Sequence, residues 1–290
     1  MNEKGLVISM MGIPEIVGPP PDARPPLQDG LWIQYMLDTC ETVEEVLEAA
    51  KDVRILTVDH YHIADRFGAS AAFECLGGEE IFYTAEDFPV SVLTNSTYND
   101  SLRAWSTYNR YGFPPSNGSL ERFCIAAEDI EKFSSTKADS AVDYAFETLH
   151  DIRSEAIYGY PNTTQWSIVF DTKRRRVFFK TYSHPGFKYF DLRDFNVSCR
   201  ESVQMLDIQT PLSGDVFPFF QDVTFEAACD HFRHFMNSWQ GVNPSQNEIE
   251  NEIRYYMNFQ CKGLSSPPRR PSGRHAPFGE GGAIPSNQER

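Results

Sequence analysis

The stretch from residue 54 to residue 95 decides the fold: RILTVDHYHIADRFGASAAFECLGGEEIFYTAEDFPVSVLTN. Its short runs are rich in β-branched and aromatic residues, which is typical of buried strands. Gly77 and Gly78 lie between two of these runs, and a glycine pair at such a place indicates a β-hairpin. The stretch therefore predicts five strands, at residues 54–59, 61–65, 71–76, 79–85 and 89–95.

The rest of the chain alternates between helical and strand-like patterns. The apolar run GLVISMMGI at residues 5–13 predicts another strand, and residues 166–171 and 176–182 predict a hairpin around a basic turn. Thr42 and Glu45 have the spacing of a helix capping box. The order strands, helices, strands favours an α+β domain over repeated βαβ units. Apolar residues at helical spacing predict helices near residues 31–40, 43–50, 102–108, 120–130, 142–152, 224–239 and 248–259.

Composition narrows the classes of function. The 290 residues include 41 acidic and 26 basic side chains, and the formal net charge is -15. A field of that sign repels phosphate groups, which argues against nucleic acid and anionic membranes as partners. No apolar run approaches the length of a membrane span. The six cysteines form no C-x-x-C pair, so neither a disulfide scaffold nor a zinc ribbon is expected. We expect an acidic globular protein, with an enzyme or a small-molecule binder both open.

Two polar residues at the borders of apolar segments are candidates for a site. Asn95 ends the last predicted strand of the central stretch, where a sheet fixes a residue and a turn exposes it. Its amide could donate to a developing oxyanion, or it could form an Asx-turn or cap a helix. Arg122 borders an apolar helical stripe and could hold a carboxylate or activate a nucleophile. The alternative is a surface arginine whose stem covers apolar residues.

Two histidine-containing patterns raise the question of a metal. His60 and His62 alternate in a predicted strand and would share one face, but no third ligand is evident. Cys229, His231 and His234 form a C-x-H-x-x-H pattern on a predicted helix, where only the two histidines share a face well. Ordinary structural roles are therefore expected for both patterns. No phosphate-binding loop, nucleotide-binding glycine motif, zinc-protease motif or nucleophile elbow occurs.

Several segments, in order along the chain, resemble the choloylglycine hydrolase and penicillin V acylase family. TVEEV resembles the helix that follows a proline-bearing loop in that family, and VLTNS resembles its VLTNSP segment. The Arg-Phe pair at 122–123 falls where members have Ser-Arg-Phe, although Glu121 replaces the serine. The similarity extends from residue 1 to about residue 192. The segments that carry it are MNEKGL (1–6), TVEEV (42–46), HYHIADRFGASAAFE (60–74), VLTNS (92–96), RF (122–123) and TQWSIVFDTKRRRVFFKTY (164–182).

This resemblance implies a fold and a mechanism. Members of the family are N-terminal nucleophile (Ntn) hydrolases of linear amide C–N bonds, with an αββα four-layer sandwich. A mature N-terminal cysteine attacks the amide, its own α-amine acts as the base, and an acyl-enzyme forms. By residue-to-residue correspondence, Asn95 matches the oxyanion-hole asparagine and Arg122 the active-site arginine. Gly12 matches a second oxyanion position, where only its backbone N–H could contribute. The resemblance implies a small N-acyl amide substrate and no cofactor, and a homo-oligomer stays open.

The sequence departs from the family at the nucleophile. None of its six cysteines occupies the matching position, and the matched region begins after the segment that carries the cysteine. We therefore expect an N-terminally incomplete Ntn fold that is inactive alone. The alternative is a non-catalytic pseudoenzyme that binds an acyl amide or a partner protein. The expected domains are an Ntn-hydrolase-like domain at residues 1–195, a helical extension at 196–261 and a disordered Pro/Gly-rich tail at 262–290.

Overall fold

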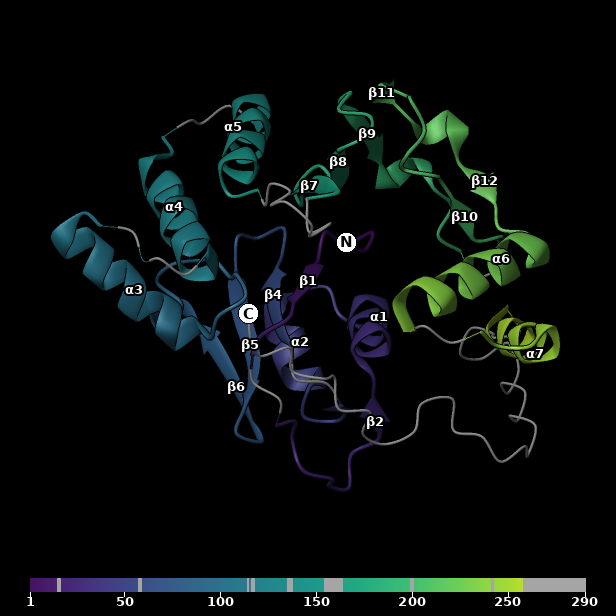
Figure 1. Ribbon diagram of the computed structural model, residues 1–290, viewed down its shortest axis with the longest axis horizontal. Helices are drawn as coiled ribbons and strands as arrows, with labels where there is room; N and C mark the ends of the chain where they lie inside the picture. The colour runs from purple at the N-terminus through teal and green to yellow at the C-terminus, as the bar shows by residue number, and fades with distance from the viewer. Residues whose placement is uncertain are drawn as a thin grey trace, which may run out of the picture. The chain divides into compact units, whose positions relative to one another are not determined.

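The computed structural model describes residues 1–14, 17–56, 59–113, 115, 118–134, 138–153, 164–198, 201–240 and 243–257. These residues belong to two compact units, and most of their helices and strands are labelled in Figure 1. The first unit holds Met1–Val197 and Leu206–Phe220. The second holds Ser198–Met205 and the residues from Gln221 on. The predicted tail at 262–290 lies outside the described residues.

The first sheet of the first unit is an antiparallel sheet with the strand order β1-β4-β5-β6. Its register places Met11 opposite His60, and His60 opposite Glu74. Gly77 and Gly78 connect β5 to β6 with φ values of 59° and 87°. Only glycine adopts such values readily, so the structure confirms the predicted glycine hairpin. The strands are β1 (Val7–Met11), β4 (His60–Ala64), β5 (Ser70–Leu76) and β6 (Glu79–Thr84).

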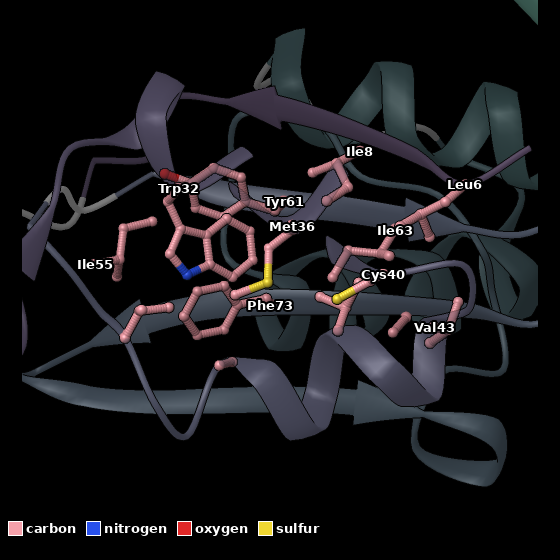
Figure 2. Packing of buried hydrophobic residues seen from close by; sticks show 14 of the residues in the cluster. Leu6, Ile8, Trp32, Met36, Cys40, Val43, Ile55, Tyr61, Ile63 and Phe73 are labelled. Carbon is pink, nitrogen blue, oxygen red and sulfur yellow. The ribbon is translucent and has the colours of Figure 1, made fainter. Parts of the chain in front are cut away.

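One face of this sheet is covered by α1 (Asp29–Thr39) and α2 (Val43–Ala49). The indole of Trp32 lies against two rings of the sheet, with centroids 5.2 Å from Tyr61 and 5.3 Å from Phe73, as Figure 2 shows. All three side chains are buried. Burying an aromatic side chain removes a large apolar area from water, so this cluster contributes strongly to stability.

The opposite face of the sheet packs on α3 (Tyr98–Tyr111) and α4 (Gly118–Lys132). Successive side chains of a strand point to opposite faces. On β5, Phe73 therefore joins the core under α1, whereas Ala72 joins a core that includes Tyr98 and Phe123. The sheet is thus buried on both faces, which explains why its central strand β5 is apolar almost throughout.

Local hydrogen bonds fix the start of α2. The hydroxyl of Thr42 accepts from the backbone N–H of Glu45 at 3.2 Å, as a capping box requires. The Glu45 carboxylate accepts from the N–H of Glu41 instead of that of Thr42, so only half of the predicted box forms. The buried carboxylate of Asp65 accepts a hydrogen bond from the backbone N–H of Val43 at 3.1 Å. Asp65 thereby ties this helix to the turn between β4 and β5.

The second sheet of the first unit has the strand order β11-β9-β8-β7. The hairpin of β7 (Trp166–Asp171) and β8 (Arg176–Thr181) confirms the predicted one. The remaining strands are β9 (Lys188–Asp191) and β11 (Gly214–Asp215), which pairs with β9 in parallel. Phe146 of α5 (Ala138–Asp151) packs on Phe178 of β8. The chain combines helices with mainly antiparallel sheets, as expected for an α+β domain, whereas the four-layer arrangement and the N-terminal incompleteness stay predictions.

Short elements complete the described chain. The first unit also contains β2 (Pro26–Leu27), which pairs with β3 (Arg54–Ile55), and the 3-10 turns η1 (Ala85–Asp87), η2 (Leu192–Asp194) and η3 (Phe217–Phe219). The second unit contains β10 (Gln204–Met205), β12 (Gln221–Asp222), α6 (Phe225–Phe235), η4 (Met236–Gln240) and α7 (Gln246–Met257). Among the described residues, no helix combines the length and apolar character that a membrane crossing requires.

The structure differs from the sequence-based expectations in three segments. Of the strand expected at 54–59, only Arg54 and Ile55 form a strand, and residues 57 and 58 lie outside the described residues. Residues 89–95 form no strand, because the Tyr98 hydroxyl accepts from the N–H of Val90 and donates to its carbonyl, in place of a neighbouring strand. Pro89, which has no N–H, begins the segment. Residues 206–220 belong to the first unit and not to a helical extension, because β11 pairs with β9. The expected domain boundary at residue 195 therefore differs from the division seen in the structure, in which the chain returns to the first unit at Leu206–Phe220.

Gly5 offers a test of how the two sheets of the first unit meet. Its φ is 87°, and a Cβ atom built on it would lie 2.4 Å from the carbonyl oxygen of Thr172 in the β7–β8 turn. Gly68 has a similar φ of 93°, but nothing lies within 4 Å of its Cβ position. We expect Gly68→Ala to lower the free energy of unfolding by about 1–2 kcal/mol, the cost of left-handed backbone. Gly5→Ala should cost roughly 1–3 kcal/mol more, because it adds a clash with backbone.

Urea unfolding of both variants measures this difference. Equal losses of stability in Gly5→Ala and Gly68→Ala would show that the contact between Gly5 and Thr172 does not constrain the fold.

Candidate functional site

Three residues that the sequence singled out come together in the first unit. The side-chain amide of Asn95 donates from Nδ2 to the carbonyl oxygen of Gly12 at 2.9 Å. Arg122 donates from Nη2 to Oδ1 of Asn95 at 2.8 Å. Asn95 and Gly12 are exposed and Arg122 is half-buried, so a ligand in solution can reach them. The cluster joins the end of β1, the turn before α3 and the N-terminal part of α4.

The same contacts settle the orientation of the Asn95 amide. An arginine can only donate hydrogen bonds, and a backbone carbonyl can only accept them. The amide must therefore direct its oxygen at Arg122 and its nitrogen at Gly12, because the reverse would place two donors and two acceptors face to face. Arg122 thus contacts a polar side chain of the cluster, and its role at the site stays a prediction. It fixes which end of the Asn95 amide faces which neighbour.

Ser119 holds the turn that carries Asn95, and sequence reasoning missed it. The Ser119 hydroxyl accepts from the backbone N–H of Asn95 at 2.9 Å, and the hydroxyl of Ser96 donates to it, also at 2.9 Å. Thr94 donates from its hydroxyl to the Ser119 carbonyl at 3.0 Å. A serine in the first turn of a helix is common for capping reasons alone. No local signal therefore pointed to its long-range contacts with residues 94–96.

Asp59 is a second residue that sequence reasoning did not identify. Its Oδ1 lies 3.6 Å from the position that a Cβ atom on Gly12 would occupy, so its carboxylate borders the space left by the missing side chain. Burial and the nearby Asp29 carboxylate raise the pKa of Asp59 above its ordinary value. In the described structure, Gly12 itself contacts Asn95 through its carbonyl oxygen.

A cavity of about 520 Å³ flanks the cluster. Its wall includes Pro14, Ser96 and Leu120, each of which is within two residues of Gly12, Asn95 or Arg122. Asp100 and Arg103 of α3 line another side and form an ion pair at 2.6 Å. The volume lies within the range of small-molecule sites, and the wall combines apolar and charged groups.

The two histidine patterns lie in different surroundings in the structure. His60 contacts Glu74 and the Thr94 carbonyl, whereas His62 contacts the hydroxyl of Ser91. Cys229 is buried between α6 and α7 in the second unit. In the part of the chain that the structure describes, no three metal-ligating side chains gather at one point.

The four cysteines that the structure describes are buried free thiols. Burial is the leading cause that raises the pKa of each: Cys40, Cys75, Cys124 and Cys229. For Cys75 the pKa rises to about 12. A catalytic thiol needs the opposite environment, with a lowered pKa and access to substrate. None of these four thiols is therefore placed to act as a nucleophile.

We expect these four cysteines to resist alkylation in the folded protein. At pH 8, a thiol with a pKa of about 12 is ionised in only roughly one molecule in ten thousand, and reaction requires the thiolate. Iodoacetamide labelling at pH 8, with sites mapped by mass spectrometry, should leave Cys40, Cys75, Cys124 and Cys229 unmodified. The same protein unfolded in guanidinium chloride is the control. Rapid labelling of Cys75 in the folded state would refute the assigned environment.

Comparisons with known proteins identify relatives of this chain. A penicillin V acylase of Pectobacterium atrosepticum is 26% identical over 243 residues, which cover 69% of this chain and 63% of that protein. The chain thus spans less than two thirds of that relative's length. The solved penicillin V acylase of Agrobacterium tumefaciens superimposes with a TM-score of 0.69 at 24% identity, covering 77% of this chain and 76% of that one.

A variant of the conjugated bile acid hydrolase of Clostridium perfringens superimposes with a TM-score of 0.58 at 19% identity. That match covers 68% of this chain and 73% of the hydrolase. At this level of identity the two structures show a shared fold. The family model described as acyl-coenzyme A:6-aminopenicillanic acid acyl-transferase matches residues 1–180, which is more than half of the 290 residues. The chain therefore belongs to this family of penicillin acyltransferases and acylases.

Proposed function

We propose that this protein provides the oxyanion-binding part of a site that hydrolyses linear C–N bonds of small N-acyl amides. One observation carries the proposal, namely the contact of Asn95 with both Gly12 and Arg122 at an exposed point of the first unit. Two facts support it further. The relatives are named as a penicillin V acylase and a conjugated bile acid hydrolase, and a cavity of suitable size lies beside the cluster.

The Asn95 amide would stabilise the negative charge that develops when an amide carbonyl is attacked. One hydrogen on Nδ2 is held by the Gly12 carbonyl, so the second is the one that donates to the substrate oxygen. Arg122 donates a hydrogen bond to Oδ1 of Asn95, which polarises the amide and prevents a 180° flip of the amide group. A donor fixed in advance stabilises a transition state without reorganising during the reaction. The backbone N–H of Gly12 is the second donor that the family resemblance implies.

The nucleophile is the part of the site that the described thiols do not supply. Cys40, Cys75, Cys124 and Cys229 are buried, and the resemblance implies a mature N-terminal cysteine that matches none of the six cysteines in residues 1–290. We infer that residues 1–290 alone bind an N-acyl amide without cleaving it. In the complete reaction, the cysteine thiolate would attack the amide carbon, the amine would leave, and water would release the acid.

Binding and turnover of the purified chain test the proposal together. The chain is mixed with penicillin V and, separately, with a conjugated bile acid. Calorimetry measures binding, and mass spectrometry measures cleavage. Binding that Arg122→Ala weakens, with no cleavage, supports the proposal. Cleavage at an enzyme-like rate would refute the inferred inactivity of residues 1–290. Absence of both binding and cleavage for every N-acyl amide tried would refute the amide site itself.

A non-catalytic role is the second candidate function. The burial of all four described thiols favours it, because none of them is exposed to a bound substrate. The same experiment separates the two functions. A pseudoenzyme would bind the amide and stay inactive in every form of the protein, whereas an acylase would gain turnover in a form that carries a nucleophilic cysteine.

We expect Asn95→Ala to remove stabilisation of the oxyanion. In a form of the protein that turns over, kcat should fall by roughly 10²–10³, the usual effect of losing one oxyanion donor. In residues 1–290 alone, affinity for a phosphonate analogue of an N-acyl amide should fall by roughly 10–100-fold, because a hydrogen bond to a charged group is lost. Asn109→Ala, at an exposed position of α3, is the matched control. Equal behaviour of the two variants would exclude Asn95 from this role.

A further inference from the structure

The peptide group between Thr94 and Asn95 is held from both sides. Its carbonyl oxygen accepts a hydrogen bond from Nε2 of His60 at 2.5 Å. Its N–H donates to the hydroxyl of Ser119 at 2.9 Å. These two bonds point in opposite directions across one planar unit, so they restrain its rotation. These backbone contacts restrain the direction of the Asn95 Cα–Cβ bond. They do so independently of the hydrogen bonds that the Asn95 side-chain amide makes.

Glu74 holds the other end of the same turn. Its Oε1 accepts from the backbone N–H of Tyr98, the first residue of α3, at 2.7 Å. The same oxygen lies 2.9 Å from Nδ1 of His60. His60 and Glu74 face each other across β4 and β5. One cross-strand pair therefore contacts the chain directly before Asn95 and three residues after it.

Both side chains of this pair are completely buried. A buried ionisable pair of this kind brings little net stability, and apolar residues of similar volume are often as good or better. A backbone carbonyl can only accept hydrogen bonds, so Nε2 of His60 is the donor in the contact with the Thr94 carbonyl. Nδ1 of the same ring faces Oε1 of Glu74, so the pair connects the Thr94 carbonyl to the Tyr98 N–H.

The neighbouring histidine does not duplicate this arrangement. Burial and the nearby His60 lower the pKa of His62 to about 4, so His62 is neutral at neutral pH. Its Nε2 contacts the hydroxyl of Ser91, four residues before Asn95, and not the turn itself. Of the two histidines on β4, only His60 reaches the peptide group that carries Asn95.

We propose that His60 and Glu74 are positioning residues that orient Asn95 for its role at the site. They act through the Thr94 carbonyl and the Tyr98 N–H, and they do not touch the substrate. The role assigned to Asn95 rests on the proposed function. The positioning itself is a property of the folded chain and can be measured without turnover.

Exchange of the Asn95 side-chain amide hydrogens with solvent provides the test. In the ¹⁵N-labelled chain, the Asn95 signals are identified by their absence from Asn95→Ala. We expect His60→Leu to accelerate their exchange by roughly tenfold, the change that corresponds to losing one hydrogen bond of typical strength. His60→Gln, which keeps an N–H donor, and Glu74→Gln, which keeps the acceptor for Tyr98, should stay close to the unsubstituted chain.

Val177→Ala, a truncation in the core of the second sheet, is the control for a general loss of stability. If His60→Leu does not fold, His60→Asn replaces it, because its amide is too short to reach Thr94. Unchanged exchange in the His60 variant, or equal acceleration in Val177→Ala, would overturn the proposal.

The binding experiment separates this proposal from the proposed function. If penicillin V and conjugated bile acid fail to bind while His60→Leu still accelerates exchange of the Asn95 amide hydrogens, the positioning role is supported and the amide-binding site is refuted. If binding occurs and depends on Arg122 while exchange does not depend on His60, the amide site stands and the positioning falls.

Discussion

The register between β4 and β5 is the constraint on which the rest of the structure depends. It places Tyr61 beside Phe73 on one face of the sheet, where Trp32 packs on both rings. It places His60 beside Glu74 on the other face. Because side chains alternate along a strand, a slip of one residue would exchange the two sets. The aromatic rings would then face the turn that carries Asn95, and the ionisable pair would lie under α1. Core and candidate site are therefore specified by the same pairing.

Much of the fold could be predicted from local pattern. The glycine pair at 77–78, the hairpin of β7 and β8, and the cap of α2 at Thr42 all depend on residues close in sequence. The strand expected at 89–95 was wrong because its apolar pattern suits a buried extended segment, whose partner turned out to be the Tyr98 side chain. The return of residues 206–220 to the first unit depends on a parallel pairing that no local pattern indicates.

The candidate site shows the same limit. Asn95, Arg122 and Gly12 could be named because the chain resembles a known family, and the structure brings them into contact. Their roles stay predictions. Ser119 and Asp59 were missed because each contributes through contacts that are distant in sequence, and serine or aspartate in a helical turn or strand end has many ordinary uses. A physical pattern can suggest that a side chain is exposed, but only the fold shows what it faces.

The close approach of Gly5 to Thr172 couples two parts of the chain that would otherwise diverge independently. In homologous sequences, any residue larger than glycine at this position would have to be accompanied by a rearranged or lengthened turn between β7 and β8. Changes in the backbone of that basic turn are constrained in the same way, because the turn occupies the space that a side chain at position 5 would need. Substitutions at position 5 and changes in the turn are therefore expected to occur together in evolution, even though more than 160 residues separate them.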